Sequence, residues 1–213
     1  MKKFLCLILV LAMSCTLFAC KSKDVTAVEE QITALGTITL ESGNAISEAE
    51  AAFSALTAKD KTSVVNAADL AAARTEYQHL LYREKADELE ELIHSLRPIT
   101  INSAEALEDA DNQYNSADIN VKLQVENLSE LSNSFQLYRF LRIDEVEKTI
   151  TAIGEVTLES GPAIEKAEAA LAELSSEDQD WVYNTYILNQ AKRDFKALQE
   201  EAENPDAETT EAK

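Results

Sequence analysis

Cysteine is nearly absent from this chain of 213 residues: only three occur, and all of them lie within the first 20 positions. The rest of the chain can therefore form no disulfide and offers no thiolate to a metal ion or to a nucleophilic reaction. Histidine is also scarce, because only His79 and His94 occur, and they form no His-x-x-x-His pattern. We interpret both histidines as incidental helix residues, and we expect no metal and no cofactor.

The chain also lacks the short motifs on which many enzymes depend. Its four glycines form no phosphate-binding loop and no nucleophile elbow, and the sequence has no EF-hand pattern. Adjacent acids such as Glu29 and Glu30 point in different directions on a helix, so they do not form a catalytic pair. We therefore predict no catalytic residues and a protein that is not an enzyme.

Positive charge is in short supply. Lysine and arginine together number 19 against 39 aspartates and glutamates, which gives a net charge of −20. Nucleic-acid binding needs basic patches that release counterions from phosphates, so we exclude nucleic acid as a partner. Anionic lipid headgroups would repel the chain for the same reason. We interpret the acidic residues as a solubilising surface.

What the chain does have is a secretory signal at its start. Two lysines precede an apolar run over residues 4–13, and the stretch Leu17-Phe18-Ala19-Cys20 follows. This stretch resembles the lipobox of bacterial lipoproteins. The resemblance implies cleavage after Ala19 and acylation of the Cys20 thiol and amine with chains such as palmitate. Residues 1–19 are then a signal peptide and residues 20–24 a lipidated tether, which anchors the protein to the cell membrane on its extracytoplasmic face.

Two alternatives remain open at this end of the chain. The segment could be an uncleaved transmembrane anchor, but its apolar stretch is shorter than the ~20 residues that a span requires. Cys15 is a second candidate for lipidation, although it lacks a leucine three positions upstream. If the signal is removed, two lysines leave with it, and the mature chain of 194 residues carries a net charge of −22.

The remainder of the chain repeats itself three times. The stretch ITLESG at residues 38–43 reappears as VTLESG at residues 156–161, with a degenerate copy, ITINSA, at residues 99–104. Internal repetition of this length indicates an array of like units. With offsets of 61 and then 57 residues the copies align without gaps, and their apolar positions coincide: Val28 with Leu89 and Val146, Ile32 with Ile93 and Ile150, and Ile46 with Leu107 and Ile164.

Each copy contains three apolar stripes with helical spacing. In the first copy the stripes are Val25, Val28, Ile32 and Leu35, then Ile46, Ala49, Phe53 and Leu56, then Leu70, Ala73, Tyr77 and Leu80. Three such helices can bury their stripes against one another. We predict an all-α fold of three tandem three-helix-bundle repeats over residues 25–82, 83–142 and 143–200. Residues 38–40 are interpreted as an extended connector, and the acidic residues 201–213 as a disordered tail.

The predicted helix ends agree with this plan. Gly36 and Gly154 follow the first helix of copies one and three, where a residue with positive φ commonly ends a helix. Serines at positions 42, 103 and 160 are predicted N-caps of the second helix, and the recurring asparagines at 66, 127 and 184 are interpreted as caps or kinks. No glycine or proline occurs over residues 67–97 or 128–153. We therefore expect shared long helices that join the repeats into an elongated staggered array.

The repeat itself has a recognisable pattern. The residues Ile153-Gly154, Val156-Thr157, Ser160 and Ala163-Ile164 resemble tandem helical repeats of cell-surface proteins from anaerobic Gram-positive bacteria. The resemblance covers residues 25–200. It implies a spacer or interaction role, and it brings no catalytic residues with it.

One cluster departs from the repeat: Trp181, Tyr183, Tyr186 and Ile187. Most of the matching positions in the other copies are polar or small, so these four residues are not expected in the core. We interpret them as candidate partner-binding residues; the alternative is that they cap the end of the array. The leading hypothesis is a membrane-anchored, non-enzymatic spacer, scaffold or protein-interaction module. The alternative is a lipoprotein that binds a glycan or small ligand through these aromatics.

Overall fold

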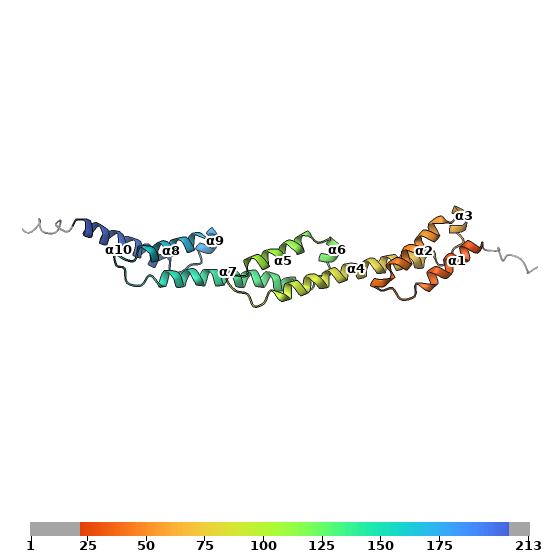
Figure 1. Ribbon diagram of the computed structural model, residues 1–213, viewed down its shortest axis with the longest axis horizontal. Helices are drawn as coiled ribbons and strands as arrows, with labels where there is room; N and C mark the ends of the chain where they lie inside the picture. The colour runs from red at the N-terminus through yellow and green to blue at the C-terminus, as the bar shows by residue number, and fades with distance from the viewer. Residues whose placement is uncertain (1–21, 205–213) are drawn as a thin grey trace, which may run out of the picture. The chain divides into compact units, whose positions relative to one another are not determined.

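The computed structural model describes residues 22–204, and every regular element in that range is a helix (Figure 1). The predicted all-α class is confirmed for these residues. Residues 1–21, which include Cys20 and the predicted signal peptide, and residues 205–213 lie outside the description. The elements are α1 (Lys23–Ala34), the 3₁₀ turn η1 (Leu40–Ser42), α2 (Gly43–Ala55), α3 (Ala58–Lys61), α4 (Ala67–Ser95), α5 (Ala104–Ser116), α6 (Ile119–Lys122), α7 (Leu128–Thr151), α8 (Gly161–Ala172), α9 (Ser176–Gln179) and α10 (Thr185–Glu203).

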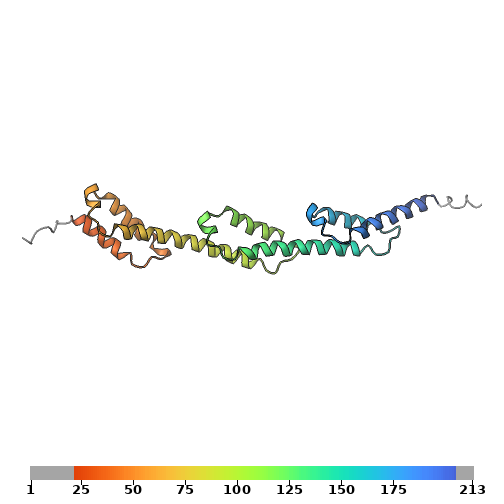
Figure 2. The ribbon, with the colours of Figure 1, turned by 180° about the vertical axis from the view of Figure 1, so that it is seen from behind.

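The helices group into two compact units, which divide the chain within α4, between Ala86 and Asp87. The first unit has one hydrophobic cluster, built by α1, α2 and α4 with the segments between them. The second unit has two clusters, and in it both α5 and α8 pack against α7 (Figures 1 and 2). Each cluster draws its residues from a single sequence copy.

The predicted apolar stripes form these clusters, with the exception of Leu80, which lies outside the cluster of the first unit. In the first unit the buried residues are Val25, Val28, Ile32, Ile46, Ala49, Leu56, Val64, Leu70 and Ala73. In the second unit they are Ile93, Leu96, Leu107, Ala110 and Leu131 in one cluster, and Ile143, Val146, Ile150, Ile153, Ile164, Ala167, Leu174, Val182, Leu188 and Ala191 in the other. Burial of one large aliphatic side chain is worth roughly 1.5–3 kcal/mol. The stripes are therefore the main source of stability against the entropy lost on folding.

The helix ends are partly as predicted. Gly36 and Gly154 adopt φ angles of 58° and 64°, the left-handed conformation that most other residues avoid. Ser42, Ser103 and Ser160 occupy the predicted N-cap positions, but their side chains cap nothing in the helix that follows. Each serine hydroxyl instead accepts a hydrogen bond at 2.9 Å from the main-chain N–H of the threonine three residues earlier. The serine therefore fixes the turn that leads into the helix.

The prediction of three helices per repeat omits a fourth, short one. Helices α3, α6 and α9 each span four residues, and a side chain from Thr57, Asp118 or Ser175 caps each of them. A four-residue helix is too short to show a periodic apolar pattern, which explains why the stripes did not reveal it. The prediction of an extended connector at residues 38–40 is also partly wrong, because Leu40 begins a 3₁₀ turn.

The long helices agree with the scarcity of glycine and proline. Helix α4 is continuous from residue 67 to 95 and α7 from 128 to 151. Two predicted boundaries are corrected: α1 begins at Lys23, inside the predicted tether, and α10 continues to Glu203, inside the predicted tail. Within residues 22–204 no helix is both long enough and apolar enough to cross a membrane.

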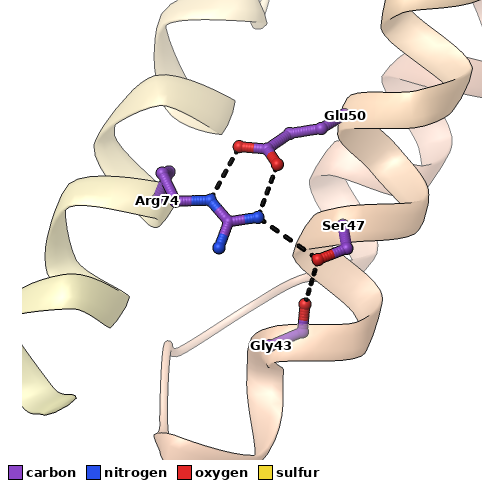
Figure 3. A network of polar contacts seen from close by, with 4 residues as sticks. All are labelled: Gly43, Ser47, Glu50 and Arg74. Atoms are coloured by element: carbon purple, nitrogen blue, oxygen red, sulfur yellow. Dashed lines mark hydrogen bonds and ion pairs between the residues drawn. The ribbon is translucent and has the colours of Figure 1, made fainter.

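A bidentate ion pair joins α2 to α4 in the first unit (Figure 3). Arg74 donates from Nε to Glu50 Oε1 at 2.8 Å and from Nη2 to Glu50 Oε2 at 2.5 Å. The same guanidinium donates to Ser47 Oγ at 3.3 Å. The hydrogen bond from Arg74 holds the pKa of the Glu50 carboxyl below its ordinary value of 4.5. Lys192 and Glu168 form the matching ion pair between α10 and α8.

Candidate partner-binding surface

The segment between α9 and α10 is hydrogen-bonded to Glu147 and Thr151 of α7. The Tyr183 main-chain N–H donates to Glu147 Oε1 at 3.1 Å. The Asn184 side-chain amide donates to the Glu147 main-chain carbonyl at 2.9 Å and to Thr151 Oγ1 at 3.1 Å. Asn184 is almost completely buried. We call this set of three hydrogen bonds the asparagine clamp.

The two bonds of the clamp that reach the glutamate recur at the matching positions of the other two sequence copies. In the first, Val65 N–H donates to Glu29 Oε1 at 2.9 Å and Asn66 donates to the Glu29 carbonyl at 3.0 Å. In the second, Glu126 N–H donates to Glu90 Oε1 at 2.8 Å and Asn127 donates to the Glu90 carbonyl at 2.9 Å. Asn127 and Asn184 do stand at the N-cap positions of α7 and α10, but their side chains make no capping bond. The interpretation as caps therefore holds for the positions of Asn127 and Asn184 but not for the bonds that their side chains make.

The clamp decides which side chains face the solvent. Val182 and Asn184 point inward, with exposed fractions of 3% and 1%, so the residues that alternate with them point outward. Trp181 is 62% exposed and Tyr183 is 72% exposed. Tyr186, in the first turn of α10, is 66% exposed. We call these three residues the Trp181 surface.

The fourth candidate residue belongs to the core. Ile187 is half-buried and packs against the hydrophobic cluster of the third sequence copy. Its counterparts Asp69 and Glu130 are acidic, which made it look like a surface residue. Of the four predicted residues, three are exposed and the fourth packs against the core.

An arginine of α7 lies against the surface. The Arg139 guanidinium carbon is 6.0 Å from the centre of the Trp181 ring, within the range of a cation–π contact. The same guanidinium donates from Nε to Asp178 and from Nη2 to Glu177 Oε1, the latter at 3.0 Å. The hydrogen bond to Asp178 is the main cause that raises the pKa of Arg139 further above its usual range. The charge on Arg139 is therefore permanent.

A groove of about 400 Å³ lies beside Arg139, between α7 and the α8–α9 segment. Its lining includes Phe135, Tyr138, Arg142, Leu174 and Asp178. Arg142 donates to Tyr138 Oη at 3.1 Å and to Glu173 at 3.3 Å. Both arginines of the groove are thus paired with carboxylates, and the groove combines aromatic faces with fixed polar groups.

Phe135 is a residue that the sequence analysis missed. Its counterparts are Arg74 and Lys192, which form the ion pairs between the second and third helices of the other copies. In the second copy the cation is replaced by phenylalanine, which is 36% exposed. The repeat alignment contained this signal, because an aromatic residue stood where two cations stood elsewhere.

The described residues contain no group of three or more His, Cys, Asp or Glu side chains that could hold a metal ion. His94 Nδ1 lies 3.7 Å from Glu130 Oε2, and Arg97 lies 3.4 Å from the same oxygen. These contacts join α4 to α7 and make no cleft. The predicted lipidation site, Cys20, lies outside the described residues.

Comparison of the chain with family models, with curated proteins and with solved structures gives no match.

Proposed function

We propose that this chain is a lipid-anchored, extracytoplasmic lipoprotein that acts as a non-enzymatic protein-interaction module. The observation that carries the proposal is the asparagine clamp, which holds Trp181 and Tyr183 outward on a fixed segment. Exposed tryptophan and tyrosine are the residues that most often anchor a protein partner. A segment that is ordered before binding loses less entropy on association.

Only the sequence supports the proposed lipid anchor. Acylation of Cys20 would bring the first repeat close to the membrane, since α1 begins at Lys23. Metabolic labelling with an alkyne-bearing palmitate tests this part of the proposal. Cys20→Ala should abolish labelling and release the protein, whereas Cys15→Ala should leave both unchanged. Labelling that depends on Cys15 would refute the assignment.

We also propose that the chain consists of three tandem three-helix-bundle repeats joined by shared long helices. Three separate hydrophobic clusters and the unbroken helices α4 and α7 support this arrangement. Such an array would act as a spacer that holds the Trp181 surface away from the anchor. Small-angle scattering tests it, because a compact chain of this length has a radius of gyration of roughly 16–17 Å and the array would exceed that clearly.

Photo-crosslinking on intact cells tests the interaction role. A photoreactive benzophenone amino acid at position 183 should capture a discrete partner protein. The matched control carries the same amino acid at position 126, which the clamp of the second copy presents in the same way. Equal capture at both positions, or none at either, would leave only the spacer role.

A second candidate function is binding of a glycan or small ligand, and the groove beside Arg139 favours it. Its aromatic faces and paired polar groups suit a ligand with both apolar and hydrogen-bonding surfaces. A panel of cell-wall oligosaccharides, titrated against the protein while its melting temperature is measured, tests this function. A saturable rise in melting temperature would favour the groove over the protein-interaction role.

A further inference from the structure

Hydrogen bonds hold the segment that carries Trp181 and Tyr183 in one conformation. Trp181 N–H donates to the Asp178 carbonyl at 3.0 Å, and Val182 N–H donates to the Gln179 carbonyl at 3.2 Å. The asparagine clamp then secures the next two residues to α7. An exposed aromatic group on so constrained a segment is a preformed binding face rather than a fluctuating loop.

The chain segment that carries this face has charge of one sign, and the cation nearest to it, Arg139 of α7, is already paired with Glu177 and Asp178. Residues 167–191 contain five acidic side chains and no lysine, arginine or histidine. Two of the acids, Glu177 and Asp180, lie in the segment just before Trp181 and are exposed. A second copy of this chain, with its net charge of −20, would be repelled. Charge complementarity therefore selects a cationic partner.

The chain contains an internal example of the expected contact. Arg139 lies over the Trp181 ring, and its nitrogens donate to Glu177 and Asp178. An indole ring with two neighbouring carboxylates is thus arranged to receive a guanidinium. Since Trp181 as a whole residue remains 62% exposed with this contact in place, it has area left for a second guanidinium. Glu177, whose side chain is 78% exposed, and Asp180 can serve that second group as acceptors.

We propose that the Trp181 surface binds an arginine-rich segment of a partner protein, with a guanidinium stacked on Trp181 and hydrogen-bonded to Glu177 or Asp180. Arginine suits this site better than lysine, because its planar group can stack on the ring and donate to a carboxylate at the same time. The inference rests on the proposed interaction function and specifies the chemistry of the partner.

Trp181 is the only tryptophan in the chain, so its fluorescence reports directly on this surface. The experiment uses residues 20–213 with Cys20→Ala, titrated with a peptide of alternating arginine and serine. The buffer contains enough salt, ~0.15 M, to screen contacts beyond about 8 Å. We expect a saturable change in Trp181 emission, and at least ~tenfold weaker binding of the matching lysine–serine peptide.

Two pairs of variants separate the site from the general acidity of the chain. Glu177→Gln with Asp180→Asn should weaken binding by about tenfold or more. Glu41→Gln with Glu48→Gln, two exposed acids of the first unit, removes the same charge and should change binding less than about twofold. Tyr183→Val with Tyr186→Ala, which installs the residues of the first copy, should weaken binding while Trp181 still reports.

Several results would overturn the inference. Equal weakening by both acidic pairs would mean that the peptide binds the net charge rather than the site. A response to neutral oligosaccharides and none to the arginine peptide would assign the surface to glycans. Concentration-dependent emission without peptide would indicate self-association. If the arginine peptide does not bind while crosslinking at position 183 still captures a protein, the inference is wrong and the proposed function stands.

Discussion

Asn184 donates its side-chain amide to the main-chain carbonyl of Glu147, 37 residues earlier in the chain, at 2.9 Å. The same bond joins Asn66 to Glu29 and Asn127 to Glu90, with the same separation in each case. A hydrogen bond that recurs three times with constant spacing is a fixed part of the fold. It sets the register between the segment before a helix and the helix on which that segment rests.

Asn184→Ala should destabilise the third cluster by about 1–3 kcal/mol. The change removes two hydrogen bonds made by an almost completely buried side chain, each worth about 0.5–1.5 kcal/mol net. Urea unfolding followed by Trp181 emission reports on this region. The control is Asn189→Ala, an exposed residue of the same helix, which should change the free energy of unfolding by less than about 0.5 kcal/mol.

Replacing Trp181 by Ser and Tyr186 by Ala should leave the free energy of unfolding within ~1 kcal/mol of the wild type. Both side chains are mostly exposed, so the change removes little buried area and one exposed cation–π contact. Circular dichroism measures the melting. The comparison is Leu188→Ala, which empties a buried position and should cost ~2–5 kcal/mol. Equal losses in the two variants would show that the aromatics are structural and would remove the basis for a binding surface.

The ion pair between Arg74 and Glu50 should make the first unit depend on pH. The lowered pKa of Glu50 means that the folded state binds its proton less tightly than the unfolded state does. The resulting stability is present above the unfolded pKa and is lost as the pH falls through the lower, folded pKa. Arg74→Gln should therefore cost at most about 0.5–1 kcal/mol at pH 7, because both side chains are partly exposed, and progressively less as the pH falls below the unfolded pKa of Glu50.

Hydrogen exchange of the α2 amides, measured by mass spectrometry, isolates this effect from the rest of the chain. Lys59→Gln is the control, since it removes one positive charge from an exposed position of α3 without touching the pair. If both variants lose the same protection at pH 7, or if the loss caused by Arg74→Gln is as large in acid as at pH 7, the ion pair is not the cause.

The fold was predictable from the sequence where the signal was local and periodic. The stripe that contains Val25, Val28 and Ile32 is buried, and Gly36 ends its helix with a positive φ. The sequence could not show where the Asn184 amide points, because its acceptor is a main-chain carbonyl on another helix. Any residue supplies such an acceptor, so no pattern marks it.

The binding surface was predictable only in part, and for a related reason. Trp181, Tyr183 and Tyr186 stood out because most of the matching positions hold polar or small residues, and all three are exposed. The same reasoning selected Ile187 as a surface residue, but its side chain is half-buried. A position on the edge of a core accepts either an acidic or an aliphatic side chain. A comparison of side-chain polarity between repeats therefore identifies departures from the pattern, but the burial of each one depends on contacts across helices.

Phe135 offers a test of the groove through the repeat itself. In the first copy its position holds Arg74, opposite Glu50, whereas the second copy has Phe135 and Asp111. Phe135→Arg combined with Asp111→Glu should rebuild the ion pair and replace the aromatic wall of the groove. We expect the melting temperature to stay within about 4 °C, since an ion pair worth up to ~1 kcal/mol offsets part of the lost apolar burial. Phe135→Arg alone should melt lower than the double variant, because Asp111 is shorter than glutamate by one methylene.

The same double variant should abolish any oligosaccharide-induced rise in melting temperature, while Phe140→Arg, an exposed site on the same helix, should leave it intact. A rise that survives in the double variant would mean that the groove is not the ligand site.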